Sequence, residues 1–235
     1  MDEAVDAFPW YHSIELPGGV VTPGIFDHRP LVPHYGLPAD LSTQRALDVA
    51  TFDGFWAFEL ERRGAEVVAV DIDRLSSLDL PPQLRSAIVA DGLDRESGQG
   101  FSLAHRALNS KVQRVVSSVY DLDPAALGTF DLVHVADLLL HLERPLDALR
   151  HIRSVTRGTA LIADVIDLHL KRSDNQLVQY LGGWWSAMWW IPSLDALAQM
   201  VLDAGFSRVR LHTVYNLAGV HEHDGLWRAV LIADA

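Results

Sequence analysis

The sequence contains no cysteine, which excludes disulfide bonds, thiolate nucleophiles and cysteine-based metal sites. Basic residues are also scarce, because 19 lysines and arginines stand against 31 aspartates and glutamates, a formal net charge of −12. A protein that reads a nucleic-acid backbone needs basic residues gathered on one face, and here they are scattered. The composition therefore argues against a nucleic-acid partner.

Long hydrophobic runs are missing as well. Apolar runs such as Leu138–Leu140 and Ala229–Ala233 fall far short of the roughly 20 residues that cross a membrane. The acidic start Met1-Asp2-Glu3-Ala4-Val5-Asp6 lacks the basic and then apolar build of a signal peptide. With 49% hydrophobic and 21% charged residues, the sequence predicts a globular, cytoplasmic protein with no membrane contact.

Residues 1–44 are rich in turn formers and predict an irregular arm that covers the rest of the protein. Beyond them the hydrophobic pattern becomes regular. It predicts seven strands, at residues 46–50, 66–70, 113–118, 130–135, 159–166, 209–215 and 226–233. It predicts helices at residues 54–63, 101–108 and 145–156, and one that Ser193 caps and Gly205 terminates. Residues 74–99 up to the second helix read as a polar connection, and no domain boundary is visible over residues 1–235.

Strands and helices alternate through the first five strands, which is typical of a doubly wound parallel α/β sheet. The last two strands follow without an intervening helix and read as an antiparallel hairpin at one edge. The prediction is a seven-stranded, mostly parallel, Rossmann-like sheet.

Ligands of such a sheet bind at the carboxyl ends of its central strands. Asp48 to Gly54 end the first strand, and Asp71 ends the second, where a carboxylate can accept hydrogen bonds from ribose hydroxyls. Tyr120 and Asp121 follow the third strand, where an aromatic ring can line a base and a carboxylate can meet its amino group. The predicted cofactor site consists of Asp48, Ala50, Phe52, Gly54, Asp71, Ile72, Tyr120, Asp121 and Ala136.

These segments resemble the successive motifs of class I S-adenosylmethionine-dependent methyltransferases. The motifs are Leu47-Asp48-Val49 with Asp53-Gly54, Val68-Ala69-Val70-Asp71, Val119-Tyr120-Asp121-Leu122 and Phe130-Asp131-Leu132-Val133, and the resemblance runs from about residue 44 to the C-terminus. It implies S-adenosylmethionine as the cofactor. More narrowly, the chain is similar to relatives of the tRNA wobble-uridine carboxymethyltransferase family, through residues 12–17, 53–59 and 141–146.

The chain departs from these families at two places. Ala50 and Phe52 stand where the first two glycines of the usual loop lie, so Ala50 is expected to keep a negative φ and Phe52 to point away from the methionine part of the cofactor. Leu140 stands where the carboxymethyltransferases have a tyrosine implicated in holding their extra carboxylate. Because an alkyl side chain cannot hydrogen-bond a carboxylate, ordinary methyl transfer fits better.

An insertion at residues 167–192 holds four of the seven tryptophans, at 184, 185, 189 and 190. We expect it to form a lid over the substrate, with Trp184, Trp185 and Trp189 joined by Trp10 and Tyr11 of the arm as substrate-binding residues. The same aromatic residues would equally suit the core or a homodimer interface.

Methyl transfer from a sulfonium requires alignment of the acceptor and, for a hydroxyl or amine, removal of its proton. Histidine is the usual base, and His141, after the fourth strand, and His12, in the arm, are the catalytic candidates. His134 reads as structural, and the sequence His221-Glu222-His223-Asp224 as a solvated turn without a metal.

The sequence therefore predicts methyl transfer to an oxygen or nitrogen atom of a small molecule. Two alternatives stay open. One is a tRNA-modifying methyltransferase, and the other is a methyltransferase fold that binds the cofactor without methylating.

Overall fold

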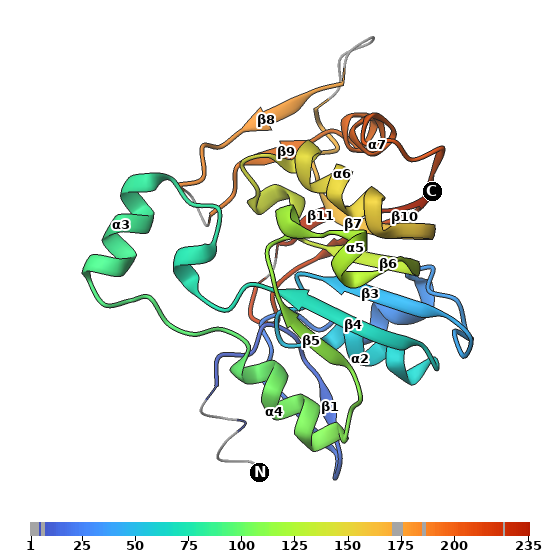
Figure 1. The fold of residues 1–235 in the computed structure, drawn as a ribbon. Coiled ribbons are helices and arrows are strands. Elements are labelled where there is room, and N and C mark those ends of the chain that lie inside the picture. Colours follow the sequence, from blue (N-terminus) through green and yellow to red (C-terminus); the bar gives the residue numbers. More distant parts are fainter. Residues whose placement is uncertain (1–4, 6–7, 171–175, 185–186, 223) are drawn as a thin grey trace.

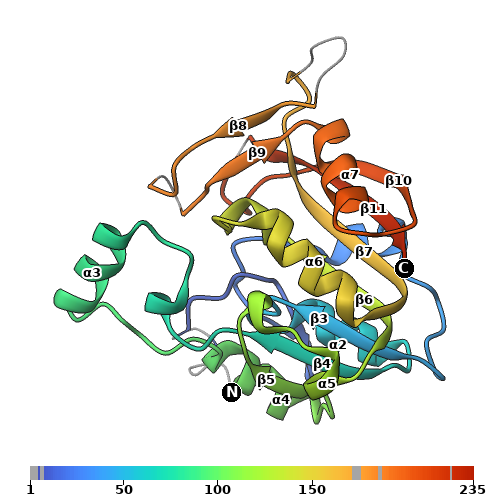
Figure 2. The same ribbon diagram turned by 45° about the horizontal axis from the view of Figure 1, so that its top comes forward.

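The fold is a twisted seven-stranded sheet covered on both faces (Figures 1 and 2). The computed structural model describes residue 5 and residues 8–170, 176–184, 187–222 and 224–235. The strand order is β10-β11-β7-β6-β3-β4-β5. The strands are β3 (Arg45–Val49), β4 (Glu66–Asp71), β5 (Gln113–Val116), β6 (Phe130–Ala136), β7 (Thr156–Ile166), β10 (Arg208–Leu217) and β11 (Leu226–Asp234).

The order and direction of the strands confirm the predicted fold. The first five strands pair in parallel, whereas β11 is antiparallel to both β7 and β10. Each parallel step needs a crossover, and all crossovers bring the carboxyl ends of the parallel strands to one edge of the sheet. The strand β6 lies beside β3, so the order in which the chain adds strands to the sheet reverses between these two parallel strands.

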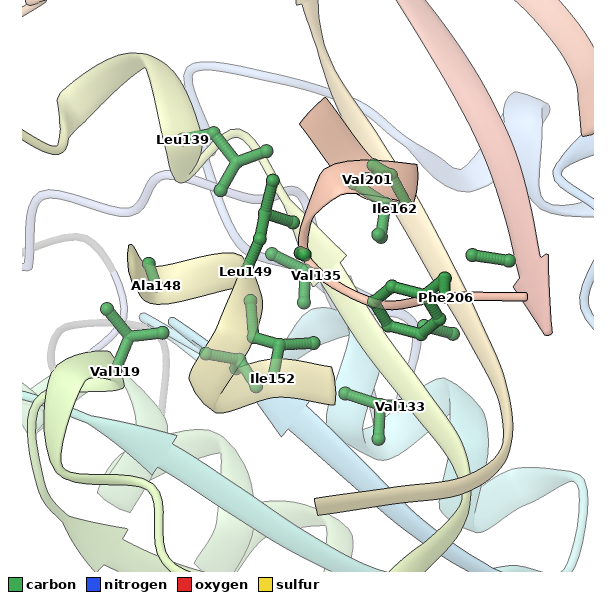
Figure 3. Close-up of a cluster of buried hydrophobic side chains, with 14 of the residues drawn as sticks. Val119, Val133, Val135, Leu139, Ala148, Leu149, Ile152, Ile162, Val201 and Phe206 are labelled. Carbon is green, nitrogen blue, oxygen red and sulfur yellow. The ribbon is translucent and has the colours of Figure 1, made fainter. Parts of the chain in front are cut away.

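One face of the sheet is covered by α6 (Pro145–Val155) and α7 (Leu194–Asp203). Figure 3 shows Leu149 and Ile152 of α6 packed toward Val133 and Val135 of β6. The side chains of a strand alternate between the two faces, and Leu132 accordingly belongs to the core on the opposite face.

The opposite face is covered by α2 (Phe55–Arg62), α4 (Gln99–Leu108) and part of the arm. The arm contains the short strands β1 (Glu15–Leu16) and β2 (Val20–Val21) and the 3-10 helix η1 (Arg29–His34). Trp10 and Tyr35 of the arm are 1% exposed, so the arm forms part of this core.

The connection at residues 74–99 differs from the prediction because it contains η2 (Leu75–Ser77) and α3 (Pro82–Ala90). No residue of α3 is buried, and Figure 1 shows this helix standing away from the sheet. A helix that buries no face leaves no apolar periodicity in its sequence, which explains why it was missed.

The remaining elements are short. They are η3 (Val119–Asp121), α5 (Pro124–Leu127), η4 (Leu139–His141), β8 (Val178–Tyr180) and β9 (Trp190–Pro192). The third strand ends two residues before the predicted boundary, since the Ser118 hydroxyl accepts from the amide of Tyr120 and begins η3. The described part of the chain has no helix with the length and hydropathy of a membrane span.

Candidate active site

A cavity of about 390 Å³ opens at the carboxyl ends of β3, β4, β5 and β6. This size lies within the usual range for small-molecule sites. One side of the cavity is built from the loops after β3, β4 and β5, which we call the cofactor half. The other side is built from the arm and the loop after β6, which we call the acceptor half.

The loop after β3 has an unusual backbone. Ala50 has a φ of 60° and Phe52 a φ of 49°, both in the left-handed region that glycine prefers. The expectation of a negative φ at Ala50 is therefore wrong. The amides of Ala50 and Thr51 both donate to the carbonyl of Val70, at 2.8 and 3.2 Å, and hold the turn against β4. The chain thus keeps the glycine-type turn without the glycines, at a conformational cost of roughly 1–2 kcal/mol per residue.

Gly54 also has a left-handed φ of 97°, but it does not line the cavity. A Cβ atom there would lie 2.5 Å from the ring of Phe58 and 2.8 Å from the ring of Phe101. Its role is therefore to start α2 and admit these two rings, and the predicted close approach of Gly54 to the cofactor is corrected.

Phe52 lies at the rim of the cavity with 46% of its surface exposed. Its ring centroid is 5.4 Å from that of Tyr11, and its amide donates to Asp71 Oδ2 at 2.6 Å. The side chain therefore does not fill the cavity.

Asp71 ends β4 and lines the cavity together with Ile72, whose amide donates to Asp71 Oδ1 at 2.8 Å. Burial raises the pKa of Asp71 to about 6, although the amide donors from Phe52 and Ile72 oppose this shift. Each carboxylate oxygen retains a lone pair for a further donor such as a ribose hydroxyl.

The end of β5 brings Tyr120 to the cavity, whereas Asp121 is exposed and lies outside it. The prediction for Asp121 is therefore corrected. Residues of one helical turn point in different directions, and η3 turns Asp121 to the surface. The residues before it, Ser117, Ser118 and Val119, take its place in the cavity wall.

Tyr120 is held by a network that sequence reasoning missed. Its hydroxyl donates to Asp79 Oδ2 at 2.6 Å, and the same oxygen accepts from the amide of Glu143 at 2.7 Å. The guanidinium of Arg144 lies 4.3 Å from the centre of the Tyr120 ring. One face of the ring is thus covered, and Asp79 ties the loop after β4 to the loop after β6.

Within residues 167–192, none of the tryptophans that the structure describes lines the cavity. Trp184 is 61% exposed, and Trp189 is buried with its Nε1 donating to the carbonyl of Asp79. Neither lines the cavity, so both predictions of substrate contact are corrected, and Trp185 lies outside the described residues. From this segment the cavity wall includes Ala187 instead.

The arm contributes Tyr11 and His12 to the acceptor half, and their roles in substrate binding and catalysis stay predictions. Trp10 does not line it, because its ring is buried in the core and its Nε1 donates to the carbonyl of Val5. An aspartate that sequence reasoning missed, Asp53, orients the arm. Its Oδ2 accepts from the amides of Tyr11 and His12 at 2.9 and 2.8 Å, and its Oδ1 pairs with His12 Nδ1.

The loop after β6 contributes Ala136, Asp137 and His141. His141 Nδ1 lies 3.1 Å from the carbonyl of Ala187, which makes Nδ1 the protonated nitrogen of the neutral ring. Burial lowers the pKa of His141, so the ring is neutral at pH 7 and its Nε2 carries a lone pair.

Asp137 is the most constrained residue of the acceptor half. It has a φ of 46°, and its carboxylate is held by Arg228 Nε of β11, at 2.8 and 2.9 Å from the two oxygens. Sequence signals existed for both residues, since Asp137 follows a strand end as Asp71 does, and Arg228 interrupts an apolar strand.

Asp48 lies deeper, and its Oδ1 is 2.7 Å from His134 Nδ1, while His134 Nε2 is 3.2 Å from the hydroxyl of Tyr35. His134 is 1% exposed, in agreement with its predicted structural role. Among the described residues, Asp48 Oδ2, Trp56 Nε1 and His28 Nδ1 are buried without a hydrogen-bond partner, and all three side chains border the cavity. A polar ligand or a water molecule in the cavity would satisfy such atoms.

The residues that the structure describes include no group of three or more potential ligands that could hold a metal ion. Of the turn at residues 221–224, His223 lies outside the described residues. The titratable side chains that line the cavity are carboxylates, imidazoles, the two phenols of Tyr11 and Tyr120 and the guanidinium of Arg144.

Comparison with known proteins identifies the family to which the chain belongs. A family model described as a methyltransferase domain matches residues 29–211. Magnesium-protoporphyrin O-methyltransferase of Rhodobacter capsulatus is 32% identical over 113 residues, which are 46% of this chain and 38% of that enzyme. The match thus spans about two fifths of the length of this relative.

Solved structures share the fold at low identity. The N-terminal domain of EvdMO1 with bound S-adenosylhomocysteine (SAH) has a TM-score of 0.63 and 18% identity, covering 100% of this chain and 94% of that one. The 1,6-didemethyltoxoflavin N1-methyltransferase of Burkholderia thailandensis has a TM-score of 0.51 and 17% identity, covering 88% and 76%. Together with the family model, these matches confirm the resemblance to class I methyltransferases, whereas the narrower tRNA wobble-uridine resemblance is not confirmed.

Proposed function

The chain belongs to the methyltransferase domain family, and we propose that it is an S-adenosylmethionine (SAM)-dependent enzyme that methylates an oxygen or nitrogen atom of a small molecule. The observation that carries this proposal is the single cavity that joins Asp71 and the turn after β3 to the bases of the arm and of the loop after β6.

The cofactor half fits SAM. When bound, SAM supplies an electrophilic methyl group on a sulfonium. Asp71 would accept hydrogen bonds from the ribose hydroxyls, with Ile72 and Tyr120 beside the nucleoside. Asp48 Oδ2 is a buried acceptor without a partner, and an ammonium group such as that of the methionine part would satisfy it.

His12 is the base best placed to take the proton of the acceptor. Because Asp53 accepts from Nδ1, the lone pair of the neutral ring lies on Nε2, which makes no hydrogen bond within the described part of the chain. Transfer of the methyl group would leave sulfur with the electron pair of the carbon–sulfur bond and would require that the acceptor oxygen or nitrogen lose its proton. The acceptor proton passes to His12 Nε2, and Asp53 stabilises the imidazolium that forms.

His141 is the second candidate base. Its Nε2 is likewise available, but its partner is the neutral carbonyl of Ala187, which stabilises an imidazolium less than a carboxylate does. We therefore assign proton removal to His12 and alignment of the acceptor to His141.

The relatives support a small acceptor. The names of two of them specify methylation of a protoporphyrin and of a toxoflavin precursor, and one EvdMO1 structure was obtained in the presence of D-fucose. The alternative of tRNA modification is disfavoured by the net charge of −12. Cofactor binding without methylation stays an alternative, because the turn at Ala50 and Phe52 lacks the usual glycines.

Calorimetry with SAH, followed by measurement of SAH release from SAM, tests these three functions. We expect binding of SAH and release of SAH with a metabolite extract. Turnover with an RNA pool alone would favour tRNA modification, and binding with no turnover on either would favour the non-methylating alternative. Absence of SAH binding would overturn the proposed function.

A further inference from the structure

The side chains that line the acceptor half indicate which class of substrate the cavity binds. Asp137 lines this wall, directly after β6, and its left-handed backbone turns the residue out of the strand direction. Its amide remains bonded to the carbonyl of Ala163 at 2.9 Å, so the turn is held by the sheet itself.

The carboxylate of Asp137 is fixed from two sides. Arg228 approaches it from β11, and the Arg228 Nη1 donates to the carbonyls of Leu217 and Leu226, at 3.2 and 3.1 Å, so the guanidinium cannot swing away. From the arm, the Tyr11 hydroxyl donates to Asp137 Oδ2 at 3.3 Å. Burial and the charge of Asp137 hold the pKa of Tyr11 well above its usual value, so this phenol stays protonated.

The fixed carboxylate still has capacity for another donor. A carboxylate offers about four lone-pair sites, of which Arg228 uses two and Tyr11 one. The neighbouring groups in the same wall, His12 Nε2 and His141 Nε2, are acceptors as well. A ligand that matches this wall must therefore present several N–H or O–H donors.

The charges at the cavity disfavour a charged ligand in the acceptor half. Of the four aspartates that line the cavity, at positions 48, 71, 79 and 137, only Asp137 lies in the acceptor half, and Arg228 balances its charge. Among the described lining residues, Arg144 alone carries a permanent positive charge, and it pairs with Asp147 at 2.7 Å. A charged acceptor would therefore lose its hydration without gaining an unpaired counter-charge, whereas an uncharged polyol would lose little.

We propose that the acceptor is an uncharged, hydroxyl-rich small molecule, one hydroxyl of which donates a hydrogen bond to Asp137 while a neighbouring hydroxyl receives the methyl group. This inference rests on the proposed methyl transfer and specifies its substrate class. Arg228 and Tyr11 act as positioning residues, because they fix the carboxylate without contacting the acceptor's reacting atom.

Fractions of a metabolite extract test the substrate class. The extract is separated by ion exchange into neutral, cationic and anionic fractions, and SAH release from SAM is measured with each. We expect turnover in the neutral fraction, and its loss after periodate treatment, which cleaves vicinal diols. Turnover confined to a charged fraction, or turnover that survives periodate, would overturn the inference. Failure of the wild-type chain to bind SAH, or SAH binding with no turnover in any fraction, would instead overturn the proposed function.

Variants test the role of Asp137 on the active fraction. We expect Asp137→Asn to raise the KM for the acceptor at least tenfold, and Tyr11→Phe to raise it about threefold, with SAH affinity unchanged within twofold in both. Tyr11→Phe keeps the Asp137–Arg228 ion pair and so remains informative if Asp137→Asn fails to fold. The exposed pair of Arg208 with Asp234 on the same hairpin supplies the control, Asp234→Asn, with unchanged kinetics. An acceptor KM within twofold of wild type in folded Asp137→Asn, or in Tyr11→Phe, would overturn the role of Asp137.

Discussion

The two halves of the cavity are built in different ways. In the cofactor half, hydrogen bonds join neighbouring units of the chain, such as Ala50 to Val70 and Phe52 to Asp71, 19 residues apart. In the acceptor half, the hydrogen bonds join residues that are distant in the sequence. Tyr11 is 126 residues from Asp137, and Arg228 is 91 residues from it. The first half follows from the order of strands, whereas the second requires the arm and the final hairpin to be in place.

This difference suggests a division of labour. The turns at the strand ends recur wherever the sheet recurs, so they suit the part of the reaction that all family members share. The acceptor half depends instead on the arm and on β11, which supply Tyr11 and Arg228. We therefore expect variants in the two halves to separate kinetically, with acceptor-half variants affecting kcat or the KM for the acceptor and cofactor-half variants affecting cofactor affinity.

The largest effect is expected at His12. His12→Gln removes the base that Asp53 orients and should lower kcat by about 100- to 10,000-fold, the usual range for loss of a general base. SAH affinity should stay within threefold. Steady-state SAH release and calorimetry measure the two quantities, and His34→Gln, an exposed histidine of the arm, is the control. A loss of activity below tenfold would transfer the role of base to His141.

The next largest effect is expected in the cofactor half. Asp71→Ala removes an acceptor for the ribose hydroxyls and should raise the Kd for SAH by about 10- to 100-fold, since hydrogen bonds to charged groups contribute roughly 1.5–3 kcal/mol. Calorimetry measures the change. Asp73→Ala, two residues along the chain and outside the cavity wall, is the matched control. Equal affinities of the two variants would contradict the ribose assignment.

The pKa of Asp71 predicts a pH dependence of cofactor affinity. Because burial raises this pKa to about 6, the carboxyl group is ionised at pH 8 and becomes protonated as the pH falls through 6. The Kd for SAH should be constant above pH 7 and rise below pH 6, by at most about tenfold per pH unit. Asp71→Asn should abolish this dependence. A wild-type Kd for SAH that does not change between pH 5 and 8 would show that the ionisation of Asp71 does not affect cofactor binding.

A smaller effect is expected at the turn after β3. Ala50→Gly relieves a left-handed alanine and should stabilise the fold by about 1 kcal/mol, net of the greater chain entropy of glycine. For a domain of this size the melting temperature should rise by roughly 2–4 °C in a thermal scan. Ala87→Gly, in the exposed helix α3, should change stability in the opposite direction. An unchanged or lowered melting temperature in Ala50→Gly would show that the turn is unstrained.

The smallest effect is expected at the exposed tryptophan of the insertion. Trp184 does not line the cavity, so Trp184→Ala should leave both the Kd for SAH and the KM for the acceptor within twofold. Trp189→Ala is the contrasting variant, because it removes the donor to the carbonyl of Asp79 and so disturbs the loop that binds Tyr120. A tenfold rise of the KM for the acceptor in Trp184→Ala would show that Trp184 contacts the substrate, as the predicted lid requires.

The elements with buried faces could be predicted from the sequence. The alternation of β3 to β7 and the Ser193 cap of α7 carry strong local signals, because burial imposes periods of two and of 3.6 residues. The position of Asp71 follows from the same pattern, since a residue directly after a parallel strand must lie at the ligand-binding edge. By contrast, α3 has no buried face and left no such signal.

The direction of individual side chains could not be predicted. Tyr120 and Asp121 are adjacent, yet Tyr120 lines the cavity and Asp121 is exposed. Successive side chains of the 3-10 helix η3 point in different directions. The side chains of Trp10 and Tyr11 likewise point in different directions. Trp10 is buried in the core, whereas Tyr11 lines the cavity. Composition indicated aromatic residues near the site but not which of them would reach it.

By itself, the sequence determined the family, the order of the strands and the carboxylate after β4, because each of these depends on residues that are close in the chain. Only the tertiary structure decided that Asp53 fixes His12 and that Arg228 and Tyr11 fix Asp137. Those contacts join residues 41 to 126 positions apart, and they form only when packing brings the arm, β6 and β11 together.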